Sequence, residues 1–247
     1  MIKLYADYHT HTVYSHGKGN IMENVEAAVE KGLKEICISD HGPGHFSYGV
    51  KHSSFKEMRE EIDVINKKVT GIKVLLGVEA NLTSMDGDID IREEDKKYLD
   101  ILLMGYHTAV IPKSIRDAKG LYFDNLWAKI SPSVHRKARL NNTRAMINAI
   151  NKHHIDIITH PGLNITIDTV ELAEAAAKSG TALEINSSHG FLTVEYVKAA
   201  MKQGVNFVIN SDAHNPRDIG NFTKGIQTAQ EAGLPVDRII NAVKDWE

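Results

Sequence analysis

Short apolar runs alternate with longer segments of helical periodicity along this 247-residue chain. Seven runs predict β-strands: Ile2–Tyr8, Ile36–Ile38, Ile72–Val78, Ile101–Gly105, Ile155–Thr159, Ala182–Ile185 and Asn206–Ile209. Most are nearly continuous in their apolar character, which is typical of parallel strands that are buried on both faces. The alternation of strands and helices therefore predicts an α/β protein built from parallel βαβ units.

Helical spacing of apolar residues fills most of the segments between the strands. It predicts helices at Ile21–Lys31, Ser54–Lys68, Arg92–Leu99, Asn142–Lys152, Asp168–Ser179, Thr193–Gln203, Thr223–Ala232 and Val236–Trp246. Asn20 can cap the first of these helices, and Gly32 can end it. Residues 108–140 lack clean periodicity, so we expect a long loop insertion there, acting as a lid, a surface excursion or a subunit contact.

Side chains that can bind a divalent cation stand at or just beyond six of the seven predicted strands. They are His9, His11, His16, His41, Glu79, His107, His160, Asp212 and His214. An α/β barrel gathers the carboxyl ends of its strands around one mouth, whereas a doubly wound sheet spreads them along a crevice. The pattern favours a single domain over residues 1–247, an α/β barrel of seven strands with a metal site at those ends.

The spacing of His9 and His11 illustrates the chemistry. Residues two apart in an extended chain point to the same side, so these imidazoles can grip one ion. Any single histidine could equally be a satisfied core residue, and only the joint pattern favours metal binding. Nine candidate ligands exceed the needs of one ion and suggest two or three. Mixed imidazole and carboxylate ligation suits zinc, manganese or iron, and Glu79 could bridge two ions.

Composition narrows the classes of partner. The net charge of −3 and the absence of basic blocks make nucleic acid an unlikely partner. No apolar run approaches the roughly 20 residues that span a bilayer, and the N-terminus does not resemble a signal peptide, so we expect a cytoplasmic protein without membrane contact. The single Cys37 excludes an intrachain disulfide and is expected to be a buried, inert thiol.

The motifs at the strand ends resemble those of the PHP (polymerase and histidinol phosphatase) family, and more closely its single-domain, YcdX-like phosphatase branch. They are His9-Thr10-His11, His16, Ser39-Asp40-His41-Gly42, Gly77-Val78-Glu79-Ala80-Asn81, Gly105-Tyr106-His107, Thr159-His160-Pro161-Gly162 and Ser211-Asp212-Ala213-His214. The chain departs from that branch in two places. The gap between His11 and His16 is one residue shorter, and residues 108–140 are longer.

The resemblance implies a distorted seven-stranded, TIM-like (β/α)7 barrel with three divalent metal ions at its mouth, with zinc preferred to manganese or iron. It implies that His9, His11, Glu79 and Asp212 hold one ion, that His16, His41 and His214 hold a second, and that a bridging Glu79 joins His107 and His160 on the third. His16 is the ligand that the shorter gap places in question.

The expected reaction is hydrolysis of a small-molecule phosphomonoester through in-line attack by a metal-bridging hydroxide, with Glu79, Asp212 and His214 as catalytic residues. No nucleophilic Ser or Cys arrangement and no Gly-rich phosphate loop is present. Three alternatives stay open: a phosphatase specific for histidinol phosphate, a phosphodiesterase or nuclease acting on nucleic-acid ends, and a non-catalytic metal-binding protein. The sequence does not define the oligomeric state.

A few further residues are candidates near the mouth. Arg217 and His189 could bind the substrate. Asp40 could orient the neighbouring His41, although adjacent side chains point apart. His45 and His52 follow the second strand and could face the mouth, but loop histidines alone carry little weight.

Overall fold

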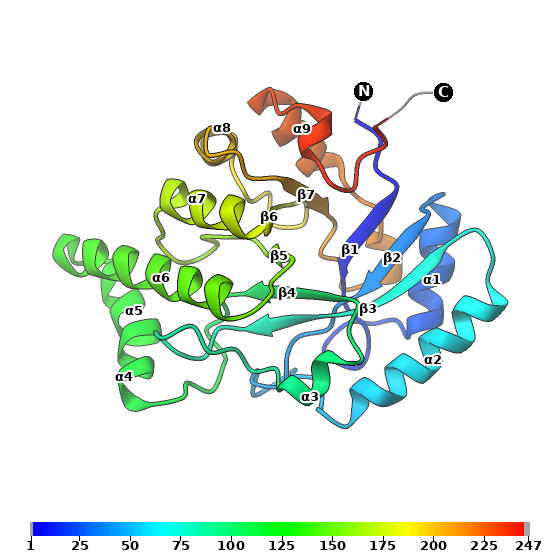
Figure 1. Cartoon of the computed structure of the whole chain (residues 1–247), viewed down its shortest axis with the longest axis horizontal. Helices are drawn as coiled ribbons and strands as arrows, with labels where there is room; N and C mark the ends of the chain where they lie inside the picture. Colours follow the sequence, from blue (N-terminus) through cyan, green and yellow to red (C-terminus); the bar gives the residue numbers. More distant parts are fainter. Residues whose placement is uncertain (1, 245–247) are drawn as a thin grey trace.

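The computed structural model describes residues 2–244 of the chain. Its seven strands are β1 Ala6–Thr10, β2 Glu35–Ile38, β3 Lys73–Asn81, β4 Ile101–Gly105, β5 Ile157–Ile158, β6 Ala182–Asn186 and β7 Phe207–Asn210. They lie side by side in sequence order, and each of the six neighbouring pairs from β1–β2 to β6–β7 is parallel. Figure 1 shows the strands curving around a common centre with helices outside them, which confirms the predicted distorted barrel.

The barrel closes between β1 and β7 with little backbone pairing. One parallel bridge joins Thr10 to Ala213, and side chains complete the seam. The carboxamide of Asn210 accepts from the backbone of β1 (Tyr8 N) at 3.0 Å. Asn241, which is fully buried, donates to Ala6 O at 2.9 Å and to Ile209 O at 2.7 Å. The buried Asp7 carboxylate accepts from the backbone beyond β7.

A small apolar cluster from all seven strands fills the barrel. Its members are Ala6, Tyr8, Cys37, Leu75, Leu103, Ile157, Ala182 and Val208. Four of the predicted ligands stand four residues after a member of this cluster: Glu79 lies on β3 itself, and His41, His107 and Asp212 lie two or three residues beyond the ends of β2, β4 and β7. Because side chains alternate along a strand, Glu79 is on the inner face as well. Cys37 is a buried free thiol, as predicted.

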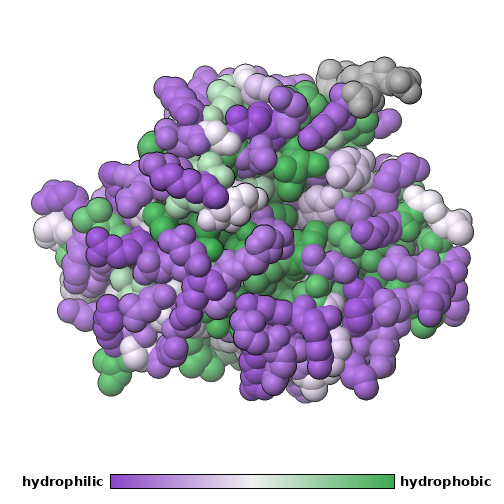
Figure 2. Space-filling view, in the orientation of Figure 1, coloured by the Kyte–Doolittle hydropathy of each residue, from purple (hydrophilic) through white to green (hydrophobic). Residues whose placement is uncertain are grey.

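The helices pack around the barrel over a larger apolar core. They are α1 Ile21–Glu30, α2 Ser54–Lys68, α3 Glu93–Lys96, α4 Ile115–Asp117, α5 Asp124–Ala128, α6 Pro132–Lys152, α7 Thr169–Ser179, α8 Val194–Met201 and α9 Thr223–Ala232. Asn20 and Glu23 form a capping box at α1, so the predicted N-cap is confirmed. Hydrophilic residues cover most of the face in Figure 2, and hydrophobic ones show between them near its centre. Within residues 2–244, no helix is long and apolar enough to cross a bilayer.

The expectation of an irregular loop at residues 108–140 is wrong for most of that segment. It contains α4, a π-helix at Ala118–Phe123, α5 and the first half of α6. The buried positions of α6 are mainly small or polar, such as Ala138, Asn142 and Ala145, whereas Leu140 is exposed. Alanine favours the helix without producing a hydrophobic stripe, and periodicity therefore revealed only the part of α6 from Asn142 onward.

The helix predicted at Val236–Trp246 does not form in the described part of that range. A short 3-10 helix, Val236–Arg238, is followed by isolated bridges from Ile239 to Phe207 and from Ala242 to Leu4. This stretch instead brings Asn241 to the seam between β1 and β7. Trp246 lies outside the described residues.

Candidate metal centre

All nine predicted ligands meet at the carboxyl ends of the strands. A cavity of about 570 Å³ occupies this mouth and is lined by seven of them: His16, His41, Glu79, His107, His160, Asp212 and His214. His9 and His11 are fully buried beside it. The structure therefore brings together residues that are up to 205 positions apart in the sequence, from His9 to His214.

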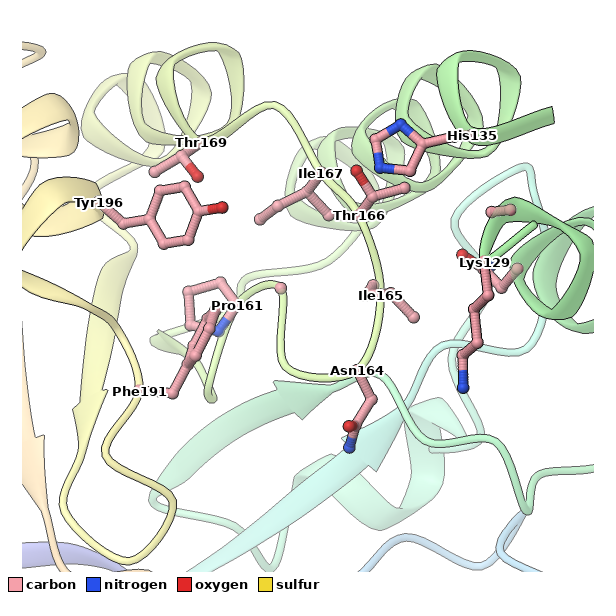
Figure 3. Close-up of a pocket in the computed structure, with 13 residues that line it drawn as sticks. Lys129, His135, Pro161, Asn164, Ile165, Thr166, Ile167, Thr169, Phe191 and Tyr196 are labelled. Carbon is pink, nitrogen blue, oxygen red and sulfur yellow. The ribbon is translucent and has the colours of Figure 1, made fainter. Parts of the chain in front are cut away.

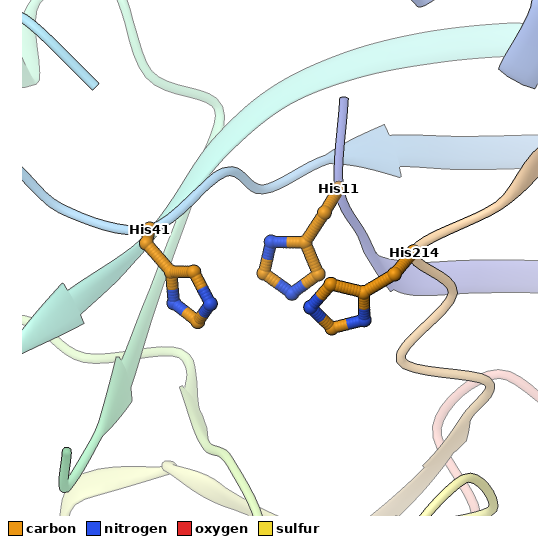
Figure 4. A group of neighbouring side chains, drawn as sticks. All are labelled: His11, His41 and His214. Carbon is orange, nitrogen blue, oxygen red and sulfur yellow. The ribbon is translucent and has the colours of Figure 1, made fainter. Parts of the chain in front are cut away.

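Three groups of side chains within this constellation have ligand atoms within 4.8 Å of one another. They are His9, His11 and Asp212; His11, His41 and His214; and His41, Glu79 and His107. Figure 4 shows the rings of the second group turned toward a shared space. The grouping overlaps the three implied ligand sets without reproducing them, because His11 and His41 each stand between two groups.

Glu79 occupies the middle of the constellation. Its Oε1 lies 3.0 Å from His160 Nε2 and 3.4 Å from His107 Nε2. Its Oε2 lies 2.8 Å from His41 Nδ1 and 3.4 Å from His9 Nε2 on the other side. Thr159 donates to Oε1 at 2.7 Å and fixes the carboxylate plane. One carboxylate thus faces two sets of imidazoles, which is the geometry of a bridging ligand.

Two side chains that were not predicted from the sequence orient the histidines. Glu184, fully buried on β6, accepts from His9 Nδ1 at 2.8 Å and from the backbone of His160 at 2.9 Å. Asn81 accepts from His107 Nδ1 at 2.7 Å. The contacts with His9 and His107 hold each ring so that its Nε2 points toward Glu79. A lone carboxylate inside the apolar run Ala182–Ile185 was the sequence signal for Glu184.

Replacement of Glu184 by glutamine is expected to lower metal affinity about 10- to 100-fold, because the amide cannot stabilise His9 and the His160 backbone as a carboxylate does. Calorimetric titration of the metal-stripped protein with Zn²⁺ measures this effect. Glu174→Gln, on the exposed face of α7, is the matched control. An affinity equal to that of the parent protein would contradict the orienting role of Glu184.

Backbone geometry at two ligands is unusual. His160 has φ 30° and Asp212 has φ 54°, both in the region that non-glycine residues rarely occupy. Such conformations persist where the surroundings impose them, and they cluster at functional sites. Gly105 is needed for a related reason, since a Cβ there would lie 2.7 Å from Glu79 Oε1 and 2.6 Å from the His107 ring.

His16 reaches the mouth through a tight turn. Its ring centroid lies 4.1 Å from that of His214 and 4.8 Å from that of His41. Asp40 holds the turn by accepting from the backbone and hydroxyl of Thr12 at 2.7 and 2.6 Å and from Ser15 at 2.5 Å. Asp40 therefore positions the segment that carries His16, and the suggestion that it orients His41 is wrong.

The electrostatic environment favours ionised carboxylates and, at several of the histidines, neutral imidazoles. At His9 and His160 the neighbouring carboxylates outweigh burial and raise the pKa of the imidazole. Burial would raise the pKa of Glu79, but the surrounding imidazoles, His107 foremost, outweigh burial and hold that pKa well below its usual range. The pKa of Asp212 is lowered in the same way by His9 and His11, against the effect of burial. Burial lowers the pKa of His11 far below its usual value and that of His16 to about 4. Ionised carboxylates and neutral imidazoles are the ligand forms.

The residues present fit metal ions. His9 Nε2 and both ring nitrogens of His11 are buried and have no hydrogen-bond partner among the described residues. Glu79 Oε2 and His41 Nδ1 approach each other to 2.8 Å without hydrogen-bond geometry. Buried polar atoms are rarely left unpaired, because their desolvation is costly. Coordination of divalent cations would satisfy these atoms, and the mixed donor set suits zinc, manganese or iron.

The remaining candidates divide between the mouth and the surface. His189 lines the mouth, with Nε2 3.4 Å from Asp212 Oδ2, and His45 lines it as a buried residue. Arg217 is exposed, is not among the residues lining the mouth, and lies 3.7 Å from its neighbour Asp218. His52 pairs with Asp95 at 2.7 Å outside the mouth. Substrate binding by His189 or Arg217 stays a prediction.

Sequence comparisons identify relatives of this chain. The model of the PHP domain family matches residues 7–188. A protein of Shewanella frigidimarina named "Probable phosphatase" is 34% identical, over 97% of this chain and 90% of its own length. A "Probable phosphatase" of Caldanaerobacter subterraneus subsp. tengcongensis is also 34% identical, over 99% of this chain and 89% of its own length.

A solved structure shares the fold. The crystal structure of histidinol phosphate phosphatase from Lactococcus lactis, in complex with zinc, L-histidinol and phosphate, superposes with a TM-score of 0.64 at 15% sequence identity. The alignment covers 94% of this chain and 94% of that one. At this identity the likeness establishes a common architecture.

Proposed function

Because this chain belongs to the PHP domain family and is a metal-dependent phosphatase, we propose that it hydrolyses small-molecule phosphomonoesters at a centre of three metal ions. The proposed ligands are His9, His11, His16, His41, Glu79, His107, His160, Asp212 and His214. Zinc is the first choice of metal, and manganese and iron are the alternatives.

The position of Glu79 is the observation that carries the proposal. Its two oxygens face different imidazole sets, and the nine donors exceed what one or two ions with open positions would use. His41 and His11 stand between neighbouring groups, so small ring rotations would complete three sites rather than one.

The protein's own residues would define where a phosphate ester binds and reacts. Bound ions would supply positive charge for the phosphate oxygens and activate a water molecule near neutral pH. Asp212 and His214 both line this cavity. His189, whose imidazole faces Asp212, could donate a hydrogen bond to a phosphate oxygen or to the leaving oxygen. Among the described residues that line the mouth, Ser188 is the only serine, and none is a cysteine.

The size and charge of the mouth favour small substrates. Its volume of about 570 Å³ accommodates a phosphate with part of its alcohol. The chain has 29 basic and 32 acidic residues, so a general attraction to nucleic acid is not expected. A phosphomonoester of small size therefore fits better than a polynucleotide.

A panel of phosphomonoesters and phosphodiesters tests the proposal. We expect metal-stripped protein to be inactive, and zinc- or manganese-loaded protein to release phosphate from monoesters much faster than it cleaves diesters. Metal content measured by mass spectrometry on the same samples should approach three ions per chain. Saturation at one ion would refute the three-ion centre, and faster cleavage of diesters would refute the monoester assignment.

A further inference from the structure

A second cavity, of about 330 Å³, opens next to the mouth. Asn164 lines both cavities, and Pro161 and Gly162, which directly follow His160, line the second one. A ligand whose phosphate lies at the mouth can therefore extend into this space. Figure 3 shows Phe191 and Tyr196 on one side of it, Lys129 and His135 on the other, and the loop of residues 161–167 between them.

The first side is aromatic and apolar. The ring centroids of Phe191 and Tyr196 are 5.9 Å apart at an interplanar angle of 50°. Gly162 lies against Phe191, since a Cβ on this glycine would be 3.4 Å from the ring. Pro161 continues this wall. Walls of this kind bind flat, unsaturated ligand groups through stacking and apolar contact.

The opposite side is basic and its charge is not neutralised by the protein. The nearby carboxylate of Asp124 lies 3.0 Å from Lys137, and that of Asp168 pairs with Arg139. Lys129 forms no ion pair within residues 2–244. An ammonium group at the rim of a cavity that also holds an imidazole favours an anionic ligand group.

We propose that this cavity, termed the side pocket, binds the alcohol portion of the substrate, and that this portion carries an aromatic ring and a second anionic group. The inference rests on the proposed function, because it places the scissile phosphate at the metal mouth. Phe191 and Tyr196 would contact the ring, and Lys129 would bind the anion. An alcohol bearing an amine, such as histidinol, would meet like charge there.

Three matched aryl esters test the specificity: 4-carboxyphenyl phosphate, phenyl phosphate and 4-(aminomethyl)phenyl phosphate. The metal-loaded protein should prefer the carboxylate to phenyl phosphate by about tenfold in kcat/KM, mainly through KM, and should disfavour the amine, as expected for one charge-assisted contact. Lys129→Gln should abolish the preference, so that 4-carboxyphenyl phosphate and phenyl phosphate are hydrolysed with similar kcat/KM. Lys119→Gln, an exposed lysine outside the side pocket, is the control.

The aromatic wall has its own test. Tyr196→Ala should lower kcat/KM for the aryl phosphates severalfold more than that for glycerol 2-phosphate, because glycerol has no ring to stack. An equal loss for both kinds of substrate would indicate a general disturbance of the site and would contradict the assigned contact between Tyr196 and the ring.

A binding measurement separates failure of this inference from failure of the proposed function. Calorimetry with 4-hydroxybenzoate and the metal-loaded protein should detect binding that Lys129→Gln weakens about tenfold. Binding that persists in Lys129→Gln would overturn the side pocket even if the esters are hydrolysed. Binding that depends on Lys129, with no ester hydrolysed, would uphold the side pocket and overturn the phosphatase reaction.

Discussion

Replacement of Glu79 by glutamine is expected to lower phosphatase activity by about a thousandfold or more. The neutral amide cannot bridge cations through both oxygens, so two of the three proposed ions would lose a ligand at once. Stabilisation by a catalytic cation is worth several kcal/mol, and each 1.36 kcal/mol corresponds to a factor of ten in rate. Steady-state kinetics and metal analysis of the purified variant would measure both effects.

The control for this experiment is Glu60→Gln on α2, where the same chemical change affects an exposed carboxylate 3.7 Å from Lys56. It should retain the parent activity and metal content. If Glu79→Gln kept its full metal content and a rate within tenfold of the parent, the bridging role would be untenable. Asp212→Asn should lose less metal than Glu79→Gln, because Asp212 serves one proposed ion.

Removal of the metal ions is expected to lower the melting temperature by roughly 10 °C. A ligand present at a thousand times its Kd stabilises the native state by about 4 kcal/mol, and 1 kcal/mol shifts the melting temperature of a domain of 150–250 residues by about 2–4 °C. The buried atoms His9 Nε2 and His11 Nε2 have no protein partner among the described residues. Removal of the metal ions would leave them unpaired, so the melting temperature should fall. Differential scanning calorimetry with and without a chelator measures the shift.

The same scan on Glu79→Gln provides the specificity control, since that variant should respond much less to the chelator. Readdition of zinc should restore the melting temperature of the parent protein. Identical melting curves for stripped and reloaded protein would mean that the mouth does not bind metal in the folded state, and the proposed centre would then fail.

The strands and the positions of the candidate ligands were largely predictable, because the apolar runs and the alternation of side chains along a strand act together. Apolar runs define the strands, and alternation along β3 places Glu79 on the inner face with Leu75. The strand order then brings the ligands together, because parallel strands in sequence order have their carboxyl ends at one mouth. The convergence of the candidate ligands therefore follows from patterns that single residues do not reveal.

The parts that escaped prediction depend on packing rather than on pattern. Glu184 is one charged residue in an apolar run, and only its contacts with His9 and His160 show its purpose. The helices between residues 115 and 141 pack small and polar residues, such as Ala138 and Asn125, whose carboxamide pairs with that of Asn142, so they lack a hydrophobic stripe. Apart from Pro161 and Gly162, the side pocket likewise arises from segments that carry no motif.

The seam between β1 and β7 links metal supply to the fate of the chain in the cell. Asn241 and Asp7 tie the two strands through hydrogen bonds, and a proposed metal site of His9, His11 and Asp212 would act as a clasp at the mouth. Without the clasp, opening of the seam would expose two strand edges, and such edges template pairing with other molecules. Metal starvation would thus favour aggregation or exchange of terminal strands between copies, in addition to the loss of activity.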